Sequence, residues 1–197
     1  MIKHNYLIFT AAFLVLFLQA CTVTFVQPYD EKLVERTEAF YKTTALAIET
    51  ARVNSPNTRK LNNGEEPSSN SGHLSKYENT YAKLKIDANS LIIRALVNSE
   101  KVDAIAVDAH DEINKLISES IPSNCAGSNA EITGQITLTV QNYLDLKCLI
   151  THWEVQHKQA PNEILTRHNW EARQRPLMQM IVDIQKSESF KKVAQVN

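Results

Sequence analysis

Apolar residues recur at steps of three and four along most of the chain, and this spacing limits the fold more than any other feature. Such steps place side chains on one face of an α-helix. No segment alternates apolar and polar residues between glycine-rich turns, as a β-sheet would require. Only 4 glycines and 6 prolines interrupt the 197 residues. The sequence therefore predicts one all-α domain, an antiparallel bundle of about four long helices joined by loops.

The first helix is expected to run from Tyr29 to Val53. Asp30 lies near its start, where a carboxylate suits the positive end of the helix dipole. Residues 54–73 are rich in Asn, Ser, Gly and Pro and contain one large aliphatic residue, so a flexible loop is expected at about 54–74. The repeating face of the helix consists of Leu33, Thr37, Phe40, Thr44, Ala47 and Ala51.

The second pattern begins near Ser75 and keeps its phase to about Ser120, which predicts one long helix and allows a kink near residue 99. Asn98 and Ser99 could equally cap a new helix, so a break near this point is the alternative. A third helix is expected from residue 132 or 134 to Lys158. The last helical region comprises residues 163–173 and 177–192, with a kink at Pro176.

The first 26 residues carry targeting information. One lysine precedes an apolar run at residues 6–18, as in a secretory signal peptide. The next residues, Leu18-Gln19-Ala20-Cys21, resemble the lipobox of bacterial lipoproteins, although Gln19 stands where a small or β-branched residue is usual. The resemblance implies that residues 1–20 are removed and that Cys21 is acylated on its sulfur and on its new amino group. The mature chain, residues 21–197, would then be the helical-bundle domain.

An uncleaved membrane anchor is the competing interpretation, because residues 6–26 are long enough to span a bilayer of about 30 Å. A membrane-spanning segment does not require a lipobox, so the presence of this motif favours the lipoprotein interpretation. Thr22 follows the cysteine. In enteric-type lipoproteins an aspartate at that position retains the protein in the inner membrane. The resemblance therefore implies an outer-membrane lipoprotein that faces the periplasm, with an inner-membrane anchor as the alternative.

Further motifs in the mature chain resemble a helical type of small bacterial lipoprotein. These motifs are Tyr29-Asp30, Tyr81-x-x-Leu84 with Arg94-Ala95, and Glu154 with Lys158. The resemblance extends over most of the mature chain and implies a location and a fold, but no catalytic residue.

Two cysteines remain in the mature domain, in a compartment that permits disulfides. A bond between Cys125 and Cys148 would contribute about 3.5 kcal/mol by constraining the unfolded chain. Alternatively, Cys148 packs inside its helix as a small apolar residue. We expect the disulfide.

Other motifs are weaker. The acidic residues at 108–112 could hold a cation, but a solvated helix face is expected. Cys148 and His152 share a helix face and could bind a soft metal with His157 or His168, yet four ligands are not evident and no metal is predicted. The chain lacks a phosphate-binding loop, a haem-attachment motif and a nucleophile elbow, so neither a cofactor nor enzymatic activity is predicted.

The C-terminal quarter is comparatively basic, and Arg167, Trp170, Arg173 and Arg175 combine cations with an aromatic ring. Such a segment could contact lipid headgroups or a protein partner. The alternative is a half-buried tryptophan on a helix whose charged face is solvated. The net charge of −1 argues against nucleic-acid binding.

Together these features predict a lipid-anchored periplasmic helical protein with a structural or protein-interaction role in the cell envelope. The alternative is a binding module for a lipid, a metal or another small ligand in or beside the bundle. A core pocket with convergent polar groups would favour the alternative, and an exposed apolar patch would favour a protein partner.

Overall fold

The computed structural model of the chain describes residues 27–98 and 137–196. The lipobox at 18–21, the alternative membrane span at 6–26, the acidic patch at 108–112 and Cys125 all lie outside these stretches. Within them, no helix is long and apolar enough to cross a membrane.

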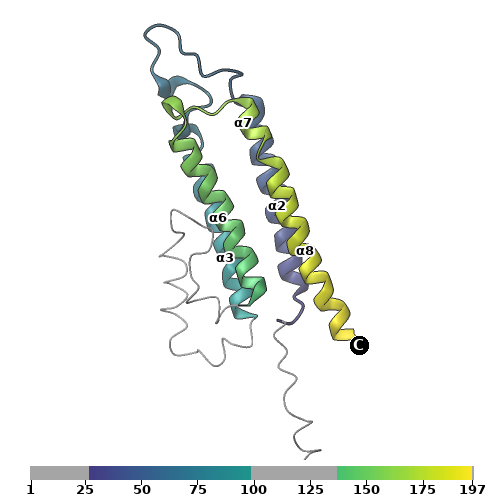
Figure 1. The fold of residues 1–197 in the computed structure, drawn as a ribbon. Coiled ribbons are helices and arrows are strands. Elements are labelled where there is room, and N and C mark those ends of the chain that lie inside the picture. The colour runs from purple at the N-terminus through teal and green to yellow at the C-terminus, as the bar shows by residue number, and fades with distance from the viewer. Residues whose placement is uncertain (1–26, 99–136, 197) are drawn as a thin grey trace, which may run out of the picture.

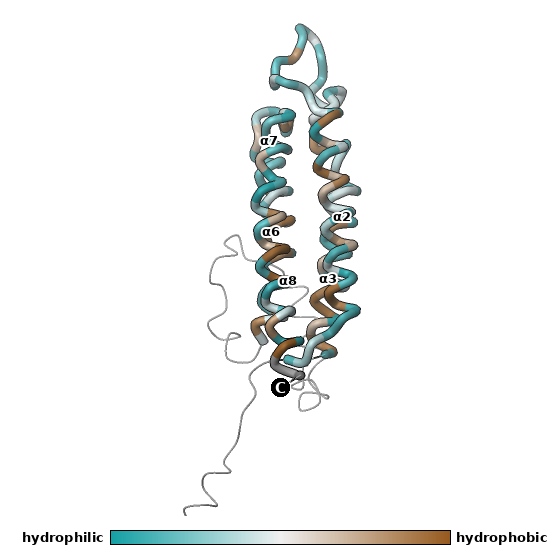
Figure 2. Tube along the Cα trace, turned by 90° about the vertical axis from the view of Figure 1, so that its right-hand side faces the viewer, coloured by the Kyte–Doolittle hydropathy of each residue, from teal (hydrophilic) through white to brown (hydrophobic). Residues whose placement is uncertain are grey.

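Four long helices run up and down as an antiparallel bundle (Figure 1). In two perpendicular views each helix lies between two others, so the four axes form a square in the order α2, α3, α6, α8 (Figures 1 and 2). No β-strand occurs in the described stretches. The predicted all-α bundle is confirmed. The helices are α2, Glu31–Asn54; α3, Glu78–Val97; α6, Leu138–Lys158; and α8, Gln174–Val196.

The bundle has two distinct ends. At the loop end, residues 55–77 connect α2 to α3, and residues 159–173 connect α6 to α8. At the terminal end, the segments that flank the helices are bonded to one another. The Gln27 side chain donates to the Ala95 carbonyl at 2.7 Å and accepts from the Thr137 hydroxyl at 2.8 Å. The Asn98 amide donates to the Pro28 carbonyl at 3.2 Å.

α2 begins and ends where the sequence predicts. The Asp30 carboxylate caps the helix by accepting from the Leu33 amide at 3.2 Å, and the backbone becomes extended at Ser55, just before Pro56. The predicted face is buried except for Ala47, which is half-buried, and Ile48 takes the interior place instead. A helix of 3.6 residues per turn shifts its inner face by one residue over this length.

α3 buries the predicted face but ends earlier than the preferred prediction. Its buried residues include Tyr81, Leu84, Ala88, Leu91 and Ala95, all anticipated from the spacing. The helix ends at Val97 with Asn98 as its C-cap, so one regular helix from Ser75 to Ser120 is wrong. The end of α3 coincides with the alternative prediction, a break near Asn98 and Ser99. Residues 99–120 lie outside the described stretches.

α6 ends at Lys158 as predicted and begins at Leu138, where the Thr137 hydroxyl caps it by accepting from the Val140 amide at 3.3 Å. Its buried face contains Val140, Tyr143, Leu146, Ile150 and Trp153, in agreement with the spacing.

The helix predicted over residues 163–173 is largely wrong. Asn162 and Glu163 adopt left-handed backbone conformations, with φ of 56° and 53°, which interrupts helical geometry. Ile164 and Leu165 then run extended beside Gly72 and His73, and only the short α7, Arg167–Glu171, is helical before α8.

The kink predicted at Pro176 is also absent. This proline is the third residue of α8, in the first turn, where a backbone N–H has no intrahelical acceptor and its loss costs little.

The connector between α2 and α3 is hydrophilic along most of its length, but its two ends are fastened to the bundle (Figure 2). The Leu165 amide donates to the Gly72 carbonyl at 3.0 Å, and the Arg59 guanidinium donates to the Ile164 carbonyl at 2.8 Å. At Gly72 a Cβ atom would lie 2.3 Å from the Leu165 carbonyl oxygen, so only glycine permits this approach. Flexibility of the connector stays a prediction, restricted here to the exposed part between Arg59 and Gly72.

Candidate functional site

A groove runs along the outer seam between α2 and α3, which we call the α2–α3 groove. It consists of three neighbouring hollows, of which the middle one shares Thr43 with the hollow at the loop end and shares Arg36 and Ser90 with the hollow at the terminal end. The hollows have volumes of about 720, 280 and 450 Å³ from the loop end towards the terminal end. Small side chains on α2 create the groove, because Ala39, Thr43 and Ala47 leave open space where larger residues would meet α3.

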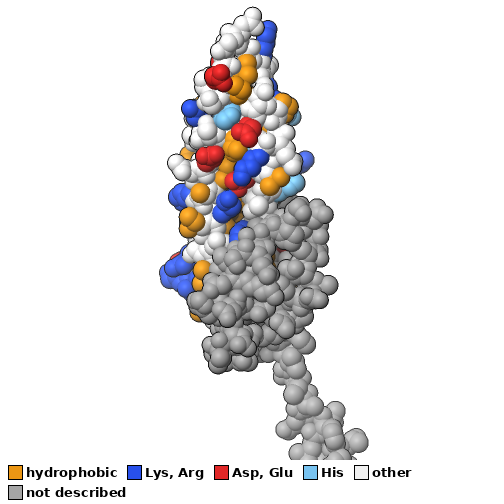
Figure 3. Space-filling model, turned by 90° about the vertical axis from the view of Figure 1, so that its left-hand side faces the viewer, with side chains coloured by type: hydrophobic (Ala, Val, Ile, Leu, Met, Phe, Trp, Pro, Cys, Tyr) orange, Lys and Arg blue, Asp and Glu red, His pale blue; other side chains and the backbone are white. Residues whose placement is uncertain are grey.

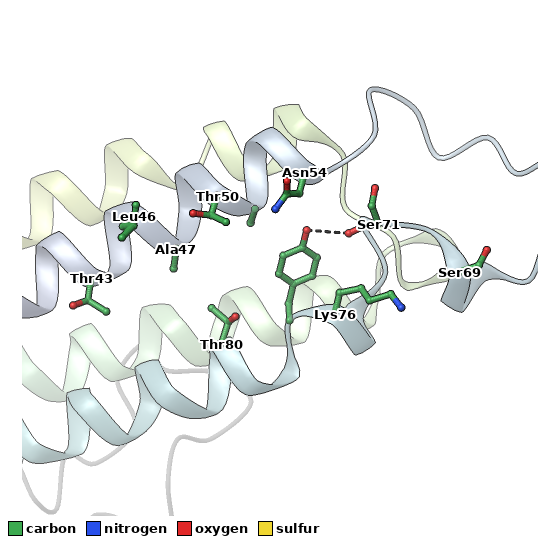
Figure 4. Close-up of a pocket in the computed structure, with 11 residues that line it drawn as sticks. Thr43, Leu46, Ala47, Thr50, Asn54, Ser69, Ser71, Lys76 and Thr80 are labelled. Atoms are coloured by element: carbon green, nitrogen blue, oxygen red, sulfur yellow. Dashed lines mark hydrogen bonds between the residues drawn. The ribbon is translucent and has the colours of Figure 1, made fainter.

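The largest hollow lies where α2 and α3 meet the connector (Figure 4). Its floor includes Ala47, Ala51 and the ring of Tyr77, whose hydroxyl donates to the Ser71 carbonyl at 2.9 Å. Several polar side chains around it form no hydrogen bond to any described residue, so they are free to bind water or a ligand. These are Thr43, Thr50, Asn54, Lys76 and Thr80.

The hollow nearest the terminal end is more apolar at its rim. Ile86, Ile93 and Val97 line it with exposed fractions of 66%, 42% and 68%. Leu46, in the hollow at the loop end, is 67% exposed. Large apolar side chains therefore flank the groove over most of its length, next to the small residues of its floor. Asn89 adds a buried side-chain oxygen that accepts no hydrogen bond from any described residue.

Unpaired charges along the α2–α3 groove are positive. Asp87 is paired with Lys83 at 2.5 Å, and its carboxylate is the only one that lines the three hollows. Arg36 near one end and Lys76 at the other form no ion pair with a described residue. On a neighbouring long side of the bundle, by contrast, charges of both signs are mixed (Figure 3). Between α3 and α6, for example, Glu154 forms ion pairs with both Lys85 and Lys158.

A chain of buried hydrogen bonds holds the loop end together beneath the groove. Arg173 donates to the Tyr81 oxygen at 2.6 Å, which lies 2.9 Å from His157 Nδ1, and His157 Nε2 lies 2.9 Å from the Gly72 carbonyl oxygen. Because that carbonyl only accepts, Nε2 carries the proton of a neutral imidazole, and Nδ1 accepts from Tyr81. Each donor in the chain thus has one acceptor, and the connector is fastened at Gly72.

The protonation states follow from burial. Burial and the nearby Arg173 cation lower the pKa of His157 to about 4, so the ring is neutral at neutral pH. Burial also raises the pKa of Tyr81 to about 12, against the opposing effect of Arg173. Burial lowers the pKa of Arg173, which nevertheless stays charged.

Aromatic rings surround the Arg173 cation. The guanidinium carbon lies 4.4 Å from the ring centroid of Trp170 and 5.4 Å from that of Trp153. Trp170 also packs against Tyr77 at 4.9 Å between centroids. We call the set of Tyr77, Tyr81, Trp153, His157, Trp170 and Arg173 the loop-end cluster. No carboxylate pairs with Arg173 in the described stretches, so the rings and two hydrogen bonds compensate its charge.

The terminal end uses different polar contacts. The hydroxyls of Thr37 and Tyr143 lie 2.7 Å apart across the core, linking α2 to α6. On α8, Lys191 and Glu188 form a buried ion pair at 2.6 Å, and Lys191 also donates to the Thr139 hydroxyl.

The predicted disulfide and metal residues have different outcomes. Cys148 is half-buried on α6 and takes part in a disulfide bond, but both other cysteines of the chain lie outside the described stretches, so its pairing with Cys125 stays a prediction. The two exposed histidines, His152 and His168, do not converge with His157, which belongs to the loop-end cluster. No group of metal-ligating side chains occurs in the described part of the chain.

Cys21, the predicted site of lipidation, lies outside the described stretches, so its acylation stays a prediction.

The basic aromatic segment is divided between interior and surface. Trp170 and Arg173 are 2% and 4% exposed, so they cannot contact a headgroup or a partner. Arg167 and Arg175 are exposed. The four residues therefore do not form one contact surface. A half-buried tryptophan was the alternative, and the ring is buried further than that.

The α2–α3 groove was not predicted from the sequence. The signal was present in the outer seam of α2, where Ala39, Thr43, Ala47 and Thr50 recur at steps of four and three beside the buried face. Small residues at such steps are also typical of an ordinary solvated helix face. The groove therefore cannot be recognised until the position of α3 beside these residues is known.

The chain was also compared with known proteins: no family model, curated sequence or solved structure matches it.

Proposed function

We propose that this protein is a lipid-anchored component of the cell envelope that binds another protein through the α2–α3 groove and performs no catalysis. The single observation that carries the proposal is the row of exposed Leu46, Ile86, Ile93 and Val97 beside a hollowed seam. Exposed apolar side chains grouped in this way mark interaction surfaces in soluble domains.

The interior supports the same conclusion. The buried polar side chains of the loop-end cluster bond mainly to one another, and Arg173, Tyr81 and His157 are all used in one hydrogen-bond chain. Groups committed in this way serve packing and register rather than turnover of a substrate. The surface groove, not the core, is therefore the proposed functional region.

The anchor is proposed from the lipobox at 18–21. Residue 27, the first described residue, lies at the terminal end, so a lipid on Cys21 would place that end towards the membrane and the loop end away from it. The α2–α3 groove runs along the bundle, so it would stand roughly upright on the membrane and remain accessible from its side.

Two measurements test the proposal. Cells that produce the wild-type chain should incorporate labelled palmitate into it, and Cys21→Ala should abolish the label and leave an unprocessed precursor. Absence of label in the wild type would contradict the anchor and favour the spanning segment at 6–26. Crosslinking of intact envelopes should then recover a stoichiometric protein partner, and recovery of none would contradict the interaction role.

The alternative function, binding of a small ligand, is favoured by one observation. The 720 Å³ hollow has the size of a small-molecule site and is surrounded by unbonded Thr50, Asn54, Lys76 and Thr80. Native mass spectrometry of protein purified from envelopes distinguishes the two functions. A bound small molecule that is lost in Thr50→Val would favour the alternative.

A further inference from the structure

We propose that the partner of the α2–α3 groove is an amphipathic α-helix that carries carboxylates near both of its ends. This inference rests on the proposed function and adds the binding mode and the chemistry of the partner.

The shape of the groove suits a helix. Two neighbouring antiparallel helices form a long concave seam, into which the side chains of a third helix can pack as ridges into grooves. From Arg36 to Asn54 the seam extends over about 27 Å, at 1.5 Å per residue, which corresponds to about five turns of a partner helix. The small residues Ala39, Thr43 and Ala47 on its floor permit a close approach of the partner.

The apolar residues define the side of the partner helix that faces the groove. Leu46 on α2 and Ile86 and Ile93 on α3 flank the seam from both sides and are 67%, 66% and 42% exposed. A helix with apolar residues at steps of three and four would cover all three. An extended peptide is disfavoured, since neither helix offers unpaired backbone groups with which a strand could bond.

The charges define the ends of the partner. Arg36 and Lys76 lie at opposite parts of the groove and have no carboxylate partner in the described stretches, whereas Asp87 between them is neutralised by Lys83. An unpaired cation at each end of an apolar seam is complementary to a helix with an acidic residue near each end.

The helix α8 presents the rival surface. It exposes Met178, Val182 and Phe190 at 51%, 37% and 77%, but no α8 residue lines any of the three hollows described above. A partner helix would meet these α8 side chains outside the described hollows, with less surface to contact than in the α2–α3 groove. We therefore assign the partner to the α2–α3 groove and use α8 as the control surface.

The test is site-specific photocrosslinking with the full chain in cells. A photoreactive phenylalanine analogue replaces Leu46, Ile86 or Ile93 in the groove, and Met178 or Val182 on α8 as controls. We expect the groove positions to capture one protein and the α8 positions to capture none. Peptide mapping should locate the crosslink in a helical segment with apolar residues at steps of three and four and acidic residues at both ends.

Charge reversal gives the second readout. The double variant Arg36→Glu and Lys76→Glu should reduce the crosslink about tenfold, because two exposed ion pairs together contribute about that factor. The matched variant Arg175→Glu and Lys186→Glu makes the same charge change on α8 and should leave the crosslink unchanged. Far-UV circular dichroism of both variants checks that each is folded.

The remaining outcomes overturn the inference. A groove crosslink to lipid, to a second copy of this chain or to a segment without acidic ends contradicts the chemistry. An equal loss in both charge variants contradicts the assignment of Arg36 and Lys76. Capture from the groove of a protein segment that is not such a helix overturns the inference alone and retains the proposed function, whereas capture only from α8, or of no protein from any position, contradicts both.

Discussion

At the loop end, four aromatic rings, a histidine and an arginine without a carboxylate partner in the described stretches fill the space between the helices. At the terminal end, aliphatic side chains pack around the Thr37–Tyr143 hydroxyl pair and the buried pair of Lys191 and Glu188. Both ends join helices that are far apart in the sequence, and the loop end also fastens the connector between α2 and α3, through Gly72. Among the described residues, the difference teaches that a bundle of ordinary helices can place a chain of specific buried contacts where the irregular segments between helices are ordered.

The largest effect is expected from Trp170→Ala. The ring is buried among Tyr77, Tyr81 and Arg173, so its removal should lower the free energy of unfolding by about 4 kcal/mol. Leu146→Ala, in the aliphatic region nearer the terminal end, should cost about 3 kcal/mol. Urea denaturation followed by far-UV circular dichroism measures both. A smaller cost for Trp170→Ala than for Leu146→Ala would contradict the comparison.

The second largest effect is expected in the pH dependence of stability, which should reveal the contribution of His157 at the loop end. The pKa of His157 is about 4 in the folded protein and about 6.5 in the unfolded chain, so the unfolded state binds the proton more readily. This contribution is fully present above pH 6.5 and is lost as the pH falls towards 4, by about 3 kcal/mol. His157→Gln keeps a donor and an acceptor but does not titrate, so its stability should vary less over this range. Identical pH profiles for the two proteins would refute the assignment.

A matched pair of hydroxyl deletions gives a smaller effect. Tyr81→Phe leaves both the Arg173 donor and the His157 acceptor without a partner, and should cost about 2 kcal/mol. Tyr143→Phe removes one hydroxyl contact with Thr37, whose own hydroxyl still donates to the Leu33 carbonyl, and should cost about 1 kcal/mol. Equal costs in urea denaturation would show that the hydrogen-bond chain at the loop end adds nothing beyond one ordinary bond.

The smallest effect is expected from Asp30→Asn at the terminal end. Asparagine keeps the N-cap of α2 but removes the ion pair with Arg94, which is 34% exposed, so the cost should be about 0.5 kcal/mol. The thermal midpoint, compared at low and high salt, measures this change. A cost above that of Tyr81→Phe would place the more specific contacts at the terminal end and reverse the comparison.

The buried faces of α2, α3 and α6 could be predicted from the sequence because they depend on local spacing. The cap at Asp30 and the end before Pro56 are equally local. The interior position of Arg173 could not be predicted, since a cation is buried only where distant residues compensate it. Tyr81 and the Trp153 carbonyl do so here, and neither is near Arg173 in the chain. The α2–α3 groove likewise depends on where α3 lies.

The prediction of a helix at Ile164 and Leu165 was wrong for a related reason. A helix was expected from residue 163, but the Leu165 amide bonds to Gly72, which lies far away in the sequence. A contact between distant segments overrode the local preference, and Gly72 carried no marker of its role beyond being one of only 4 glycines.

The loop-end cluster has a spectroscopic consequence. The chain contains 2 tryptophans, Trp153 and Trp170, and both belong to this cluster. Intrinsic tryptophan fluorescence therefore reports on one end of the molecule, while the helical signal averages over the whole length of the bundle. Fluorescence that changes before helix content would mark opening of the loop end by itself, and the wild-type chain can reveal such a step without any added label.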